Sequence, residues 1–212
     1  MSKVDPMLYR MAKELVRPGA CVWDVGANVG LFSFCAAALA GQSGLVLAIE
    51  PDLWLANLLL RSAQRWRLKD YDAAKVDVLC AAASDRAQVE LLQIAARARA
   101  SNYLTRSPGN TQTGGTRFSQ PTVSLTLDSL LGYFPSPAVL KIDVETHEAE
   151  VLNGARHLLK THRPVVWCEV SFQSSPLVTD IFHSLGYQLF NPAEKERVPI
   201  ERATWNTLAI PL

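Results

Sequence analysis

The chain has 212 residues, of which 49% are hydrophobic and 19% are charged, and its 21 basic and 20 acidic side chains leave a formal net charge of +1. This length and composition predict one globular domain with a sizeable hydrophobic core. The balanced charge excludes a global field that would recruit nucleic acid or an anionic membrane, so we expect neither as a partner.

Cysteine usage and the N-terminus indicate a cellular compartment. The cysteines are widely separated and lie among apolar residues, at Cys21, Cys35, Cys80 and Cys168. This pattern is typical of buried free thiols in a reducing environment rather than of a disulfide framework or a zinc site. Residues 1–16 lack an apolar signal core, and no stretch approaches the roughly 18 consecutive apolar residues of a spanning helix. We therefore expect a cytoplasmic protein.

The first half of the chain alternates between helices and strands. Residues 1–19 predict a helix that starts at Pro6 and carries Met7, Met11 and Leu15 on one face. Strands then follow over 20–25, 45–50 and 76–81, with helices over about 29–40 and 52–67 between them. This order predicts a parallel sheet, and the apolar strands VLAIE and VLKIDV indicate that helices cover both of its faces.

The pattern loosens after Ser84. A strand VELLQI precedes a polar loop over 101–121, which is too long for an ordinary connector and is either a lid over the substrate or disordered. Strands are then predicted at 122–127, 138–144 and 164–170, and helices at about 148–160 and 176–185. The last strands, YQLF and TLAI, have no helix between them and predict an antiparallel hairpin. We therefore predict a single α/β domain over 1–212, with a mostly parallel seven-stranded sheet.

The stretch VWDVGANVG, residues 22–30, is an apolar strand that ends in an acid and then in small residues. A plain tight turn explains Gly26 and Gly30, and also Asn28, which tolerates left-handed geometry, but it does not explain Asp24. A loop that lets a ligand approach the backbone explains all four residues, because open α/β sheets place their sites at the carboxyl ends of strands.

A second acid indicates which ligand this would be. Glu50 ends the next strand, where a carboxylate is well placed to accept hydrogen bonds from both hydroxyls of a ribose. The glycine spacing lacks both the G-x-G-x-x-G array and the Lys-Ser/Thr pair of phosphate-binding loops, so a ligand with ribose and adenine but no phosphates fits best. Ser84 and Asp85, after the third strand, can contact the edge of an adenine.

The stretch KIDVETHEAE, residues 141–150, brings further acids to the same sheet edge. Asp143 and Glu145 lie at the carboxyl end of one strand, and Glu169 ends the strand that follows it in the chain. These acids either form an ion-paired network around a lysine of the strand, or orient a substrate hydroxyl, remove its proton or hold a divalent cation. We expect the metal-free arrangement. His147 is the histidine nearest to them, with a structural role as the alternative to proton transfer.

In their order and spacing these motifs resemble the FkbM-type methyltransferases, which use S-adenosylmethionine. The resemblance covers roughly residues 20–170 through VWDVGANVGLFSF, AIEPD, AAASD, RASNYL, TLDSL, VLKIDVETHEAEVLNGARHLL and VVWCEV. It implies a Rossmann-like methyltransferase fold and methyl transfer, usually to a hydroxyl of a sugar, polyketide or similar metabolite. By position it implies an S-adenosylmethionine site with Asp24, Gly26, Asn28 and Gly30 at the methionine part, Glu50 at the ribose, and Ser84 and Asp85 at the adenine.

We therefore expect an O-methyltransferase that acts on a small-molecule or glycan hydroxyl, with Asp143, Glu145, His147 and Glu169 as its catalytic residues. One departure is Thr146, where the family usually has glycine. A non-catalytic cofactor-binding module, with Thr146 as the lesion, is one alternative. An NAD-dependent oxidoreductase is the other, although the missing third glycine opposes it. The sequence leaves open whether the chain forms a homodimer. The arginines around the long loop could bind an acidic or phosphorylated substrate; they are Arg97, Arg99, Arg106 and Arg117.

Overall fold

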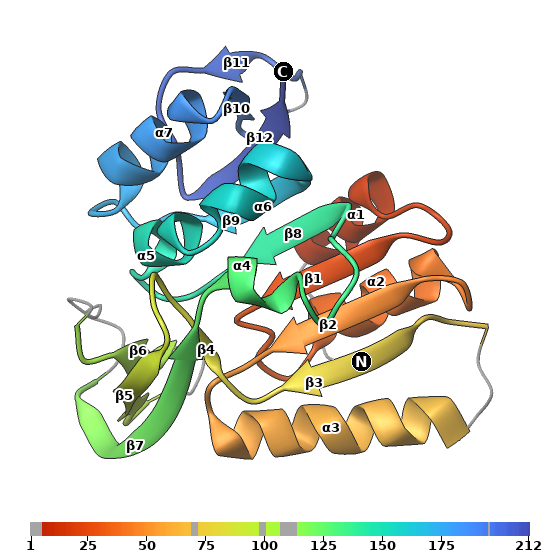
Figure 1. Ribbon diagram of the computed structural model, residues 1–212, viewed down its shortest axis with the longest axis vertical. Helices are drawn as coiled ribbons and strands as arrows, with labels where there is room; N and C mark the ends of the chain where they lie inside the picture. Colours follow the sequence, from red (N-terminus) through yellow and green to blue (C-terminus); the bar gives the residue numbers. More distant parts are fainter. Residues whose placement is uncertain (1–5, 69–71, 98–100, 107–113, 195) are drawn as a thin grey trace.

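The computed structural model describes residues 6–68, 72–97, 101–106, 114–194 and 196–212 (Figure 1). The helices are α1 (Pro6–Leu15), α2 (Leu31–Ala40), α3 (Leu53–Leu68), α4 (Leu127–Leu130), α5 (Glu148–Asn153), α6 (Arg156–Thr161) and α7 (Ser175–Ser184). The strands are β1 (Cys21–Val25), β2 (Leu45–Ile49), β3 (Lys75–Leu79), β4 (Ala82–Ala83), β5 (Gln88–Ala95), β6 (Tyr103–Leu104), β7 (Thr116–Leu125), β8 (Val139–Ile142), β9 (Val165–Glu169), β10 (Tyr187–Phe190), β11 (Pro199–Ile200) and β12 (Asn206–Pro211).

The main sheet has eight strands in the order β11-β10-β12-β9-β8-β1-β2-β3. The run from β9 to β3 is parallel, as predicted, whereas β12 is antiparallel to both β9 and β10. The pairing of β10 with β12 confirms the predicted antiparallel arrangement of YQLF and TLAI. The prediction of seven strands was wrong, because the two residues of β11 add to the outer side of β10. A strand this short carries no alternation that a sequence pattern could reveal.

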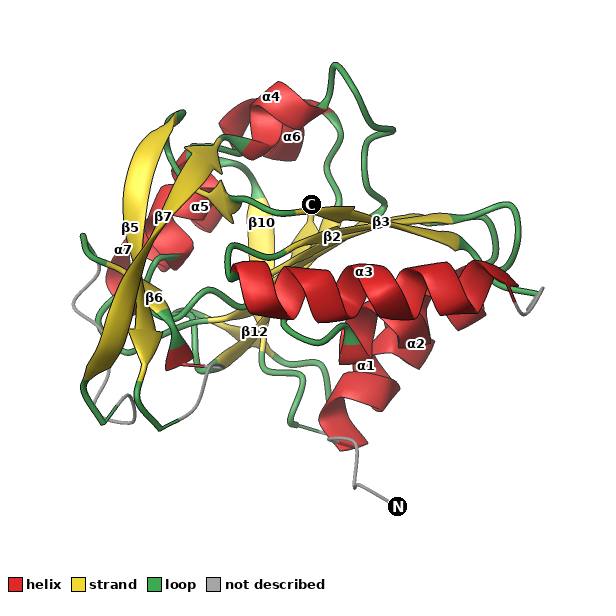
Figure 2. Ribbon diagram, turned by 90° about the horizontal axis from the view of Figure 1, so that it is seen from below, coloured by secondary structure: helices red, strands yellow, loops and turns green. Residues whose placement is uncertain are grey.

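Helices cover both faces of this sheet, as predicted (Figure 2). Successive residues of β1 show the division, since Val22 belongs to the core under α1, α2 and α3, and Trp23 to the core under α4 to α7. The predicted helix over 148–160 is broken into α5 and α6 around Gly154. A Cβ at Gly154 would lie 2.0 Å from the carbonyl oxygen of Ser84, so this contact requires the glycine.

A second sheet was not predicted. It has four strands in the order β4-β7-β5-β6 and stands beside the main sheet (Figures 1 and 2). The interpretation of 101–121 as a loop was therefore wrong at both ends, where β6 and the first part of β7 lie, while 107–113 fall outside the described residues. The polar residues of β7 form a strand because they pair antiparallel with β5 over most of its length, a tertiary contact that overrides local propensity.

Two expectations from the sequence, buried free cysteines and the absence of a membrane-spanning helix, can be checked over the described residues. All four cysteines are free thiols, but only Cys168 is fully buried and Cys80 is exposed, so the expectation of four buried thiols was wrong. No described helix combines the length and the apolar character needed to cross a membrane.

Candidate functional site

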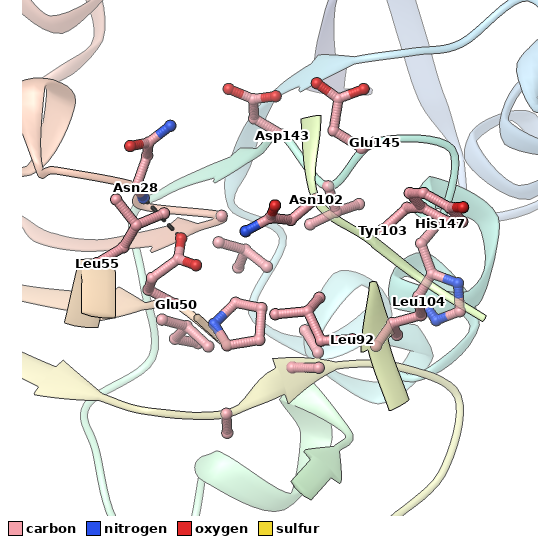
Figure 3. A pocket seen from close by; sticks show the side chains of 18 of the residues that line it. Asn28, Glu50, Leu55, Leu92, Asn102, Tyr103, Leu104, Asp143, Glu145 and His147 are labelled. Atoms are coloured by element: carbon pink, nitrogen blue, oxygen red, sulfur yellow. Dashed lines mark hydrogen bonds between the residues drawn. The ribbon is translucent and has the colours of Figure 1, made fainter. Parts of the chain in front are cut away.

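A cavity of about 240 Å³ opens at the carboxyl ends of β1, β2 and β8 (Figure 3). The second sheet forms its opposite wall, where Leu92 of β5 pairs with Leu104 of β6 and both side chains line the space. The lining residues are Val25, Gly26, Asn28, Ile49, Glu50, Pro51, Leu55, Ala81, Ala82, Ala83, Leu92, Asn102, Tyr103, Leu104, Asp143, Val144, Glu145, His147 and Glu169. Apolar walls with a few polar groups are the usual make-up of a small-molecule site.

Glu50 supplies the buried carboxylate of this cavity. One carboxylate oxygen accepts the Asn28 backbone N–H at 2.8 Å, and the other accepts the Asp52 backbone N–H at 2.9 Å. The side chain is almost entirely buried, and burial raises the pKa of Glu50 to about 7 despite these two hydrogen bonds. Each oxygen has a further lone pair, so the carboxylate can accept hydrogen bonds from two vicinal hydroxyls of a ribose.

Asp52 and Asn102 are residues that sequence reasoning missed. The fully buried Asp52 carboxylate accepts the Trp54 backbone N–H at 2.8 Å at the start of α3, and its other oxygen accepts the Asn102 side-chain amide at 2.8 Å. Gln120 of β7 adds a second connection by donating to the Pro51 carbonyl at 2.8 Å. These bonds fix the second sheet against the segment after Glu50. The RASNYL motif, which contains Asn102, was the sequence signal that could have identified this residue as part of the site.

The glycine loop is shaped by its neighbours as well as by the cavity. Gly26 and Asn28 both line the cavity, with φ values of 78° and 53°. A Cβ on Gly26 would lie 1.8 Å from the Asp143 carbonyl oxygen, and one on Gly30 would lie 2.2 Å from a methyl of Leu59. Gly30 itself does not line the cavity. A glycine is needed at position 30 because the loop packs closely against Leu59 of α3.

Asp24 lies behind the cavity wall rather than on it. It is fully buried, its Oδ2 accepts the Ser33 hydroxyl at 2.6 Å, and its Oδ1 lies 3.6 Å from Nζ of Lys141. The same Nζ lies 3.1 Å from Asp143 and near the rings of Phe32 and Trp167. Burial raises the pKa of Asp24, and Lys141 and Ser33 offset this only in part. For Lys141, burial lowers the pKa, but the carboxylates of Asp143, Asp24 and Glu169 outweigh it and raise the pKa overall.

Ser84 and Asp85 join His147 in a polar network beside the cavity. The Ser84 hydroxyl lies 3.0 Å from Nε2 of His147 and donates to the Asp85 carboxylate at 3.1 Å. The same hydroxyl accepts a hydrogen bond from the Arg106 guanidinium at 3.1 Å. Arg106 also forms an ion pair with Glu90 of β5. Of these residues His147 lines the cavity, whereas Ser84 and Asp85 do not. Burial lowers the pKa of His147, so its imidazole is neutral near pH 7.

The backbone after β8 turns sharply at two successive residues that are not glycine. Glu145 and Thr146 have φ values of 47° and 70°, which is a strained region for a β-branched threonine. The Thr146 N–H donates to the Glu148 carboxylate at 2.8 Å, which holds this turn against the start of α5. Thr146 therefore adopts the left-handed conformation that a glycine at this position would take.

A second cavity of about 200 Å³ adjoins the first. Asp143, Glu145 and Glu169 line both cavities and so stand at their junction. The second cavity is completed by Thr146, Glu148, Ser171, Phe172, Gln173 and Trp205. The structure thus brings together three of the predicted catalytic residues. His147 faces the first cavity only. Over the described residues, no three His, Cys, Asp or Glu side chains are grouped so that they could hold a metal ion.

The fold is that of several solved methyltransferases. The chain is similar to the methyltransferase FkbM of Methylobacillus flagellatus KT, with a TM-score of 0.61 and 16% identity over 95% of this chain and 50% of that one. It therefore spans about half the length of that protein. A precorrin-6y C5,15-methyltransferase of Geobacter metallireducens GS-15 has a TM-score of 0.56 at 11% identity, covering 100% of this chain and 90% of that one. A SAM-dependent O-methyltransferase of Thermotoga maritima has a TM-score of 0.53 at 15% identity, covering 100% and 67%.

At these identities the structural likeness defines the fold, which is the α/β fold of methyltransferases. No curated protein sequence matches the chain. The family model of the methyltransferase FkbM domain matches residues 24–189, and the chain belongs to this methyltransferase family.

Proposed function

We propose that the protein binds S-adenosylmethionine in the first cavity and transfers its methyl group to a hydroxyl oxygen of a small molecule or glycan in the cytoplasm. The observation that carries this proposal is the junction of the two cavities. One cavity offers a ribose-binding carboxylate between apolar walls, and the other shares with it the carboxylates of Asp143, Glu145 and Glu169.

The residues of the first cavity fit such a cofactor. Glu50 accepts the ribose hydroxyls, and Ala81 to Ala83 with Leu92 and Leu104 cover the flat faces of the adenine. Gly26 and Asn28 present loop backbone to the amino acid part. Asp24 and Gly30 do not line this cavity, and we assign both a supporting role, Asp24 through its pair with Lys141 and Gly30 through its packing against Leu59. When bound, S-adenosylmethionine supplies a methyl group on a positively charged sulfur.

The shared carboxylates act on the acceptor. Asp143, Glu145 and Glu169 would hold the acceptor hydroxyl at the junction, and one of them would take its proton as the oxygen bonds to the methyl carbon, the sulfur–carbon bond breaks and S-adenosylhomocysteine leaves. Most of the rate comes from holding that oxygen in line, because the cofactor carries the reactive group. His147 is neutral and tied to Ser84, so we assign it a positioning role at the far end of the first cavity.

Calorimetric titration with S-adenosylhomocysteine, with NAD as the comparison ligand, tests the cofactor. We expect saturable binding of the former alone, weakened by about 10- to 100-fold in Glu50→Ala. Asp77→Ala is the matched control, because Asp77 pairs with Lys75 outside both cavities. Binding of NAD alone, or equal affinity in Glu50→Ala and the parent protein, would contradict the proposal.

A further inference from the structure

Asn102 reaches the first cavity from the side of the smaller sheet. It directly precedes β6 and lines the cavity, and Figure 3 shows its amide group turned toward the side on which Glu50 lies. Its bond to Asp52 holds the smaller sheet in place, but that bond uses only part of the amide. The remaining part faces a space that a ligand can enter.

Two partners fix which way round the Asn102 amide lies. Its oxygen accepts the Ala95 backbone N–H at 2.9 Å, and its nitrogen donates to the Asp52 carboxylate at 2.8 Å. In a flipped amide, hydrogens would face the Ala95 donor and the oxygen would face a carboxylate, so both contacts would become repulsive. The amide nitrogen is therefore held on the Asp52 side.

One hydrogen of this amide nitrogen is left for a ligand. An asparagine nitrogen carries two hydrogens, and the Asp52 carboxylate accepts one of them. Within the described part of the chain, the hydrogen bonds of the Asn102 side chain end at Asp52 and Ala95. Because Asn102 lines the cavity, an acceptor atom bound there can take the second hydrogen.

Asp52 positions this donor relative to the ribose-binding carboxylate. Its backbone N–H donates to Glu50 at 2.9 Å while its own carboxylate holds the Asn102 nitrogen, so one fully buried residue orients both groups. The two groups are complementary toward a hydroxyl, which has one hydrogen to donate and two lone pairs to accept. Glu50 accepts the hydrogen, and Asn102 donates to a lone pair that a carboxylate cannot use.

The donor opposite Glu50 is neutral. In the described part of the chain, no lysine or arginine lines the first cavity. Arg106 pairs with Glu90, and Arg117 donates to a backbone carbonyl. Arg99 lies outside the described residues. A neutral amide beside a carboxylate suits an uncharged hydroxyl, whereas a phosphate at this place would meet Glu50 without a cation to offset the repulsion.

From these contacts we propose that Asn102 is a ligand-binding residue that forms, together with Glu50, a clamp on one ribose hydroxyl of S-adenosylmethionine. In this ribose clamp the hydroxyl donates to Glu50 and accepts the second amide hydrogen of Asn102. The clamp takes its acceptor from the main sheet and its donor from the smaller one, and it selects ribose over deoxyribose. This inference rests on the proposed function, because it adds a residue to that cofactor site.

Calorimetric titration with S-adenosylhomocysteine and with its 2′-deoxy and 3′-deoxy analogues tests the ribose clamp. The parent protein should bind both analogues more weakly, because each lacks a hydroxyl that Glu50 accepts. In Asn102→Ala, binding of S-adenosylhomocysteine should weaken by about three- to tenfold, and discrimination against one analogue should shrink by a similar factor. Equal affinity of the parent protein for all three ligands overturns the inference, as does parental discrimination against both analogues in Asn102→Ala.

Gln120→Ala is the control that separates the ribose clamp from the docking of the smaller sheet. Gln120 donates to the Pro51 carbonyl and accepts the Leu53 N–H, so it also holds that sheet, but it lines neither cavity. This variant should keep the parental discrimination against both analogues. If it loses as much discrimination as Asn102→Ala, docking of the sheet sets the specificity and the inference is overturned.

The parent protein provides a test that does not depend on the folding of Asn102→Ala. NMR signals of the two Asn102 side-chain amide protons can be assigned through their proximity to the Ala95 amide proton. One of them should shift when S-adenosylhomocysteine binds, and this shift should be lost with one of the two deoxy analogues. Signals that respond equally to all three ligands, or to none, overturn the inference.

The same titrations separate this inference from the proposed function. If the parent protein does not bind S-adenosylhomocysteine, the proposed function fails and the ribose clamp fails with it. If the parent protein binds it, Glu50→Ala weakens that binding and Asn102→Ala keeps the parental discrimination, only the role of Asn102 in the ribose clamp is wrong.

Discussion

The Asp143 carbonyl oxygen lies so close to Gly26 that a Cβ on the glycine would be 1.8 Å from it. This contact joins the loop after β1 to the segment after β8, which are the two stretches that carry the most distinctive motifs of the sequence. Both segments line the first cavity. The glycine is required by the protein backbone itself, whatever ligand binds.

Replacing Gly26 with alanine should therefore destabilise the fold by about 3 kcal/mol or more, because the backbone must separate to make room. Gly41→Ala is the matched control, since Gly41 also has a positive φ, 66°, but has open space around the position of a Cβ. That variant should cost only the strain of a backbone conformation that is nearly exclusive to glycine, with φ 66° and ψ −179°, about 1–3 kcal/mol. Urea unfolding measures both, and equal losses would show that the contact with Asp143 relaxes freely.

Affinity for S-adenosylhomocysteine should depend on pH through Glu50. Burial raises the pKa of this carboxyl to about 7, so below that pH the folded protein holds a proton that must leave before both oxygens can accept ribose hydroxyls. Binding should tighten as pH rises through 7 and weaken by up to about tenfold per unit below it. Calorimetry at several pH values provides the measurement. Glu50→Gln should bind more weakly and without this dependence, and a flat profile for the parent protein would refute the assignment.

Lys141→Met should cost about 3–5 kcal/mol of folding stability, because it leaves the fully buried Asp24 without its cation. Adding Asp24→Asn should recover most of the loss, since the amide needs no counter-charge. Lys75→Met, which breaks an exposed pair with Asp77, should change stability by less than about 1 kcal/mol. Thermal and urea unfolding would measure the stability of the three variants. If the double variant is no more stable than Lys141→Met, the unpaired charge of Asp24 is not the cause of the loss.

At position 146 the usual order of glycine and alanine should be reversed. Thr146 has a φ of 70°, so Thr146→Gly should be more stable than Thr146→Ala by about 1 kcal/mol. At Ser62, an exposed position inside α3, the alanine variant should be the more stable by about the same amount. Urea midpoints compare the pairs, and alanine ahead of glycine at both sites would show that the turn at 145–146 relaxes.

Methyl transfer by Thr146→Gly tests the non-catalytic alternative. Because threonine already adopts the backbone conformation that glycine would take, we expect turnover within about threefold of the parent protein, a change below 1 kcal/mol. Turnover that appears only in the glycine variant would instead support a non-catalytic module that Thr146 has disabled.

The parallel part of the main sheet could be predicted because apolar strands alternate clearly with helices from residue 20 to 81, and again after 138. The second sheet could not, because β7 is a polar and largely exposed strand whose partner, β5, lies more than 20 residues earlier in the chain. Ser, Thr and Gln in such a strand look like loop composition until the pairing is known.

At the site, Glu50 and the carboxylates after β8 and β9 could be placed because parallel strands end at one edge. The burial of Asp24 could not be predicted, because it depends on the pairing of β1 with β8, which sets Lys141 beside Asp24. The placement of Phe172 and Trp205 on one cavity could not be predicted either, because it depends on the antiparallel register of β9 and β12.

The first cavity lies along a seam between two sheets, with Ile49 and Glu50 at one side and Leu92 and Leu104 at the other. Apart from the connecting chain, polar contacts such as those from Asn102 and Gln120 fasten the smaller sheet there. A molecule bound in the seam would contact both sheets and stabilise their arrangement relative to each other. Slowed amide exchange along β5 and β6 would then register occupancy of a cavity that neither strand could form alone.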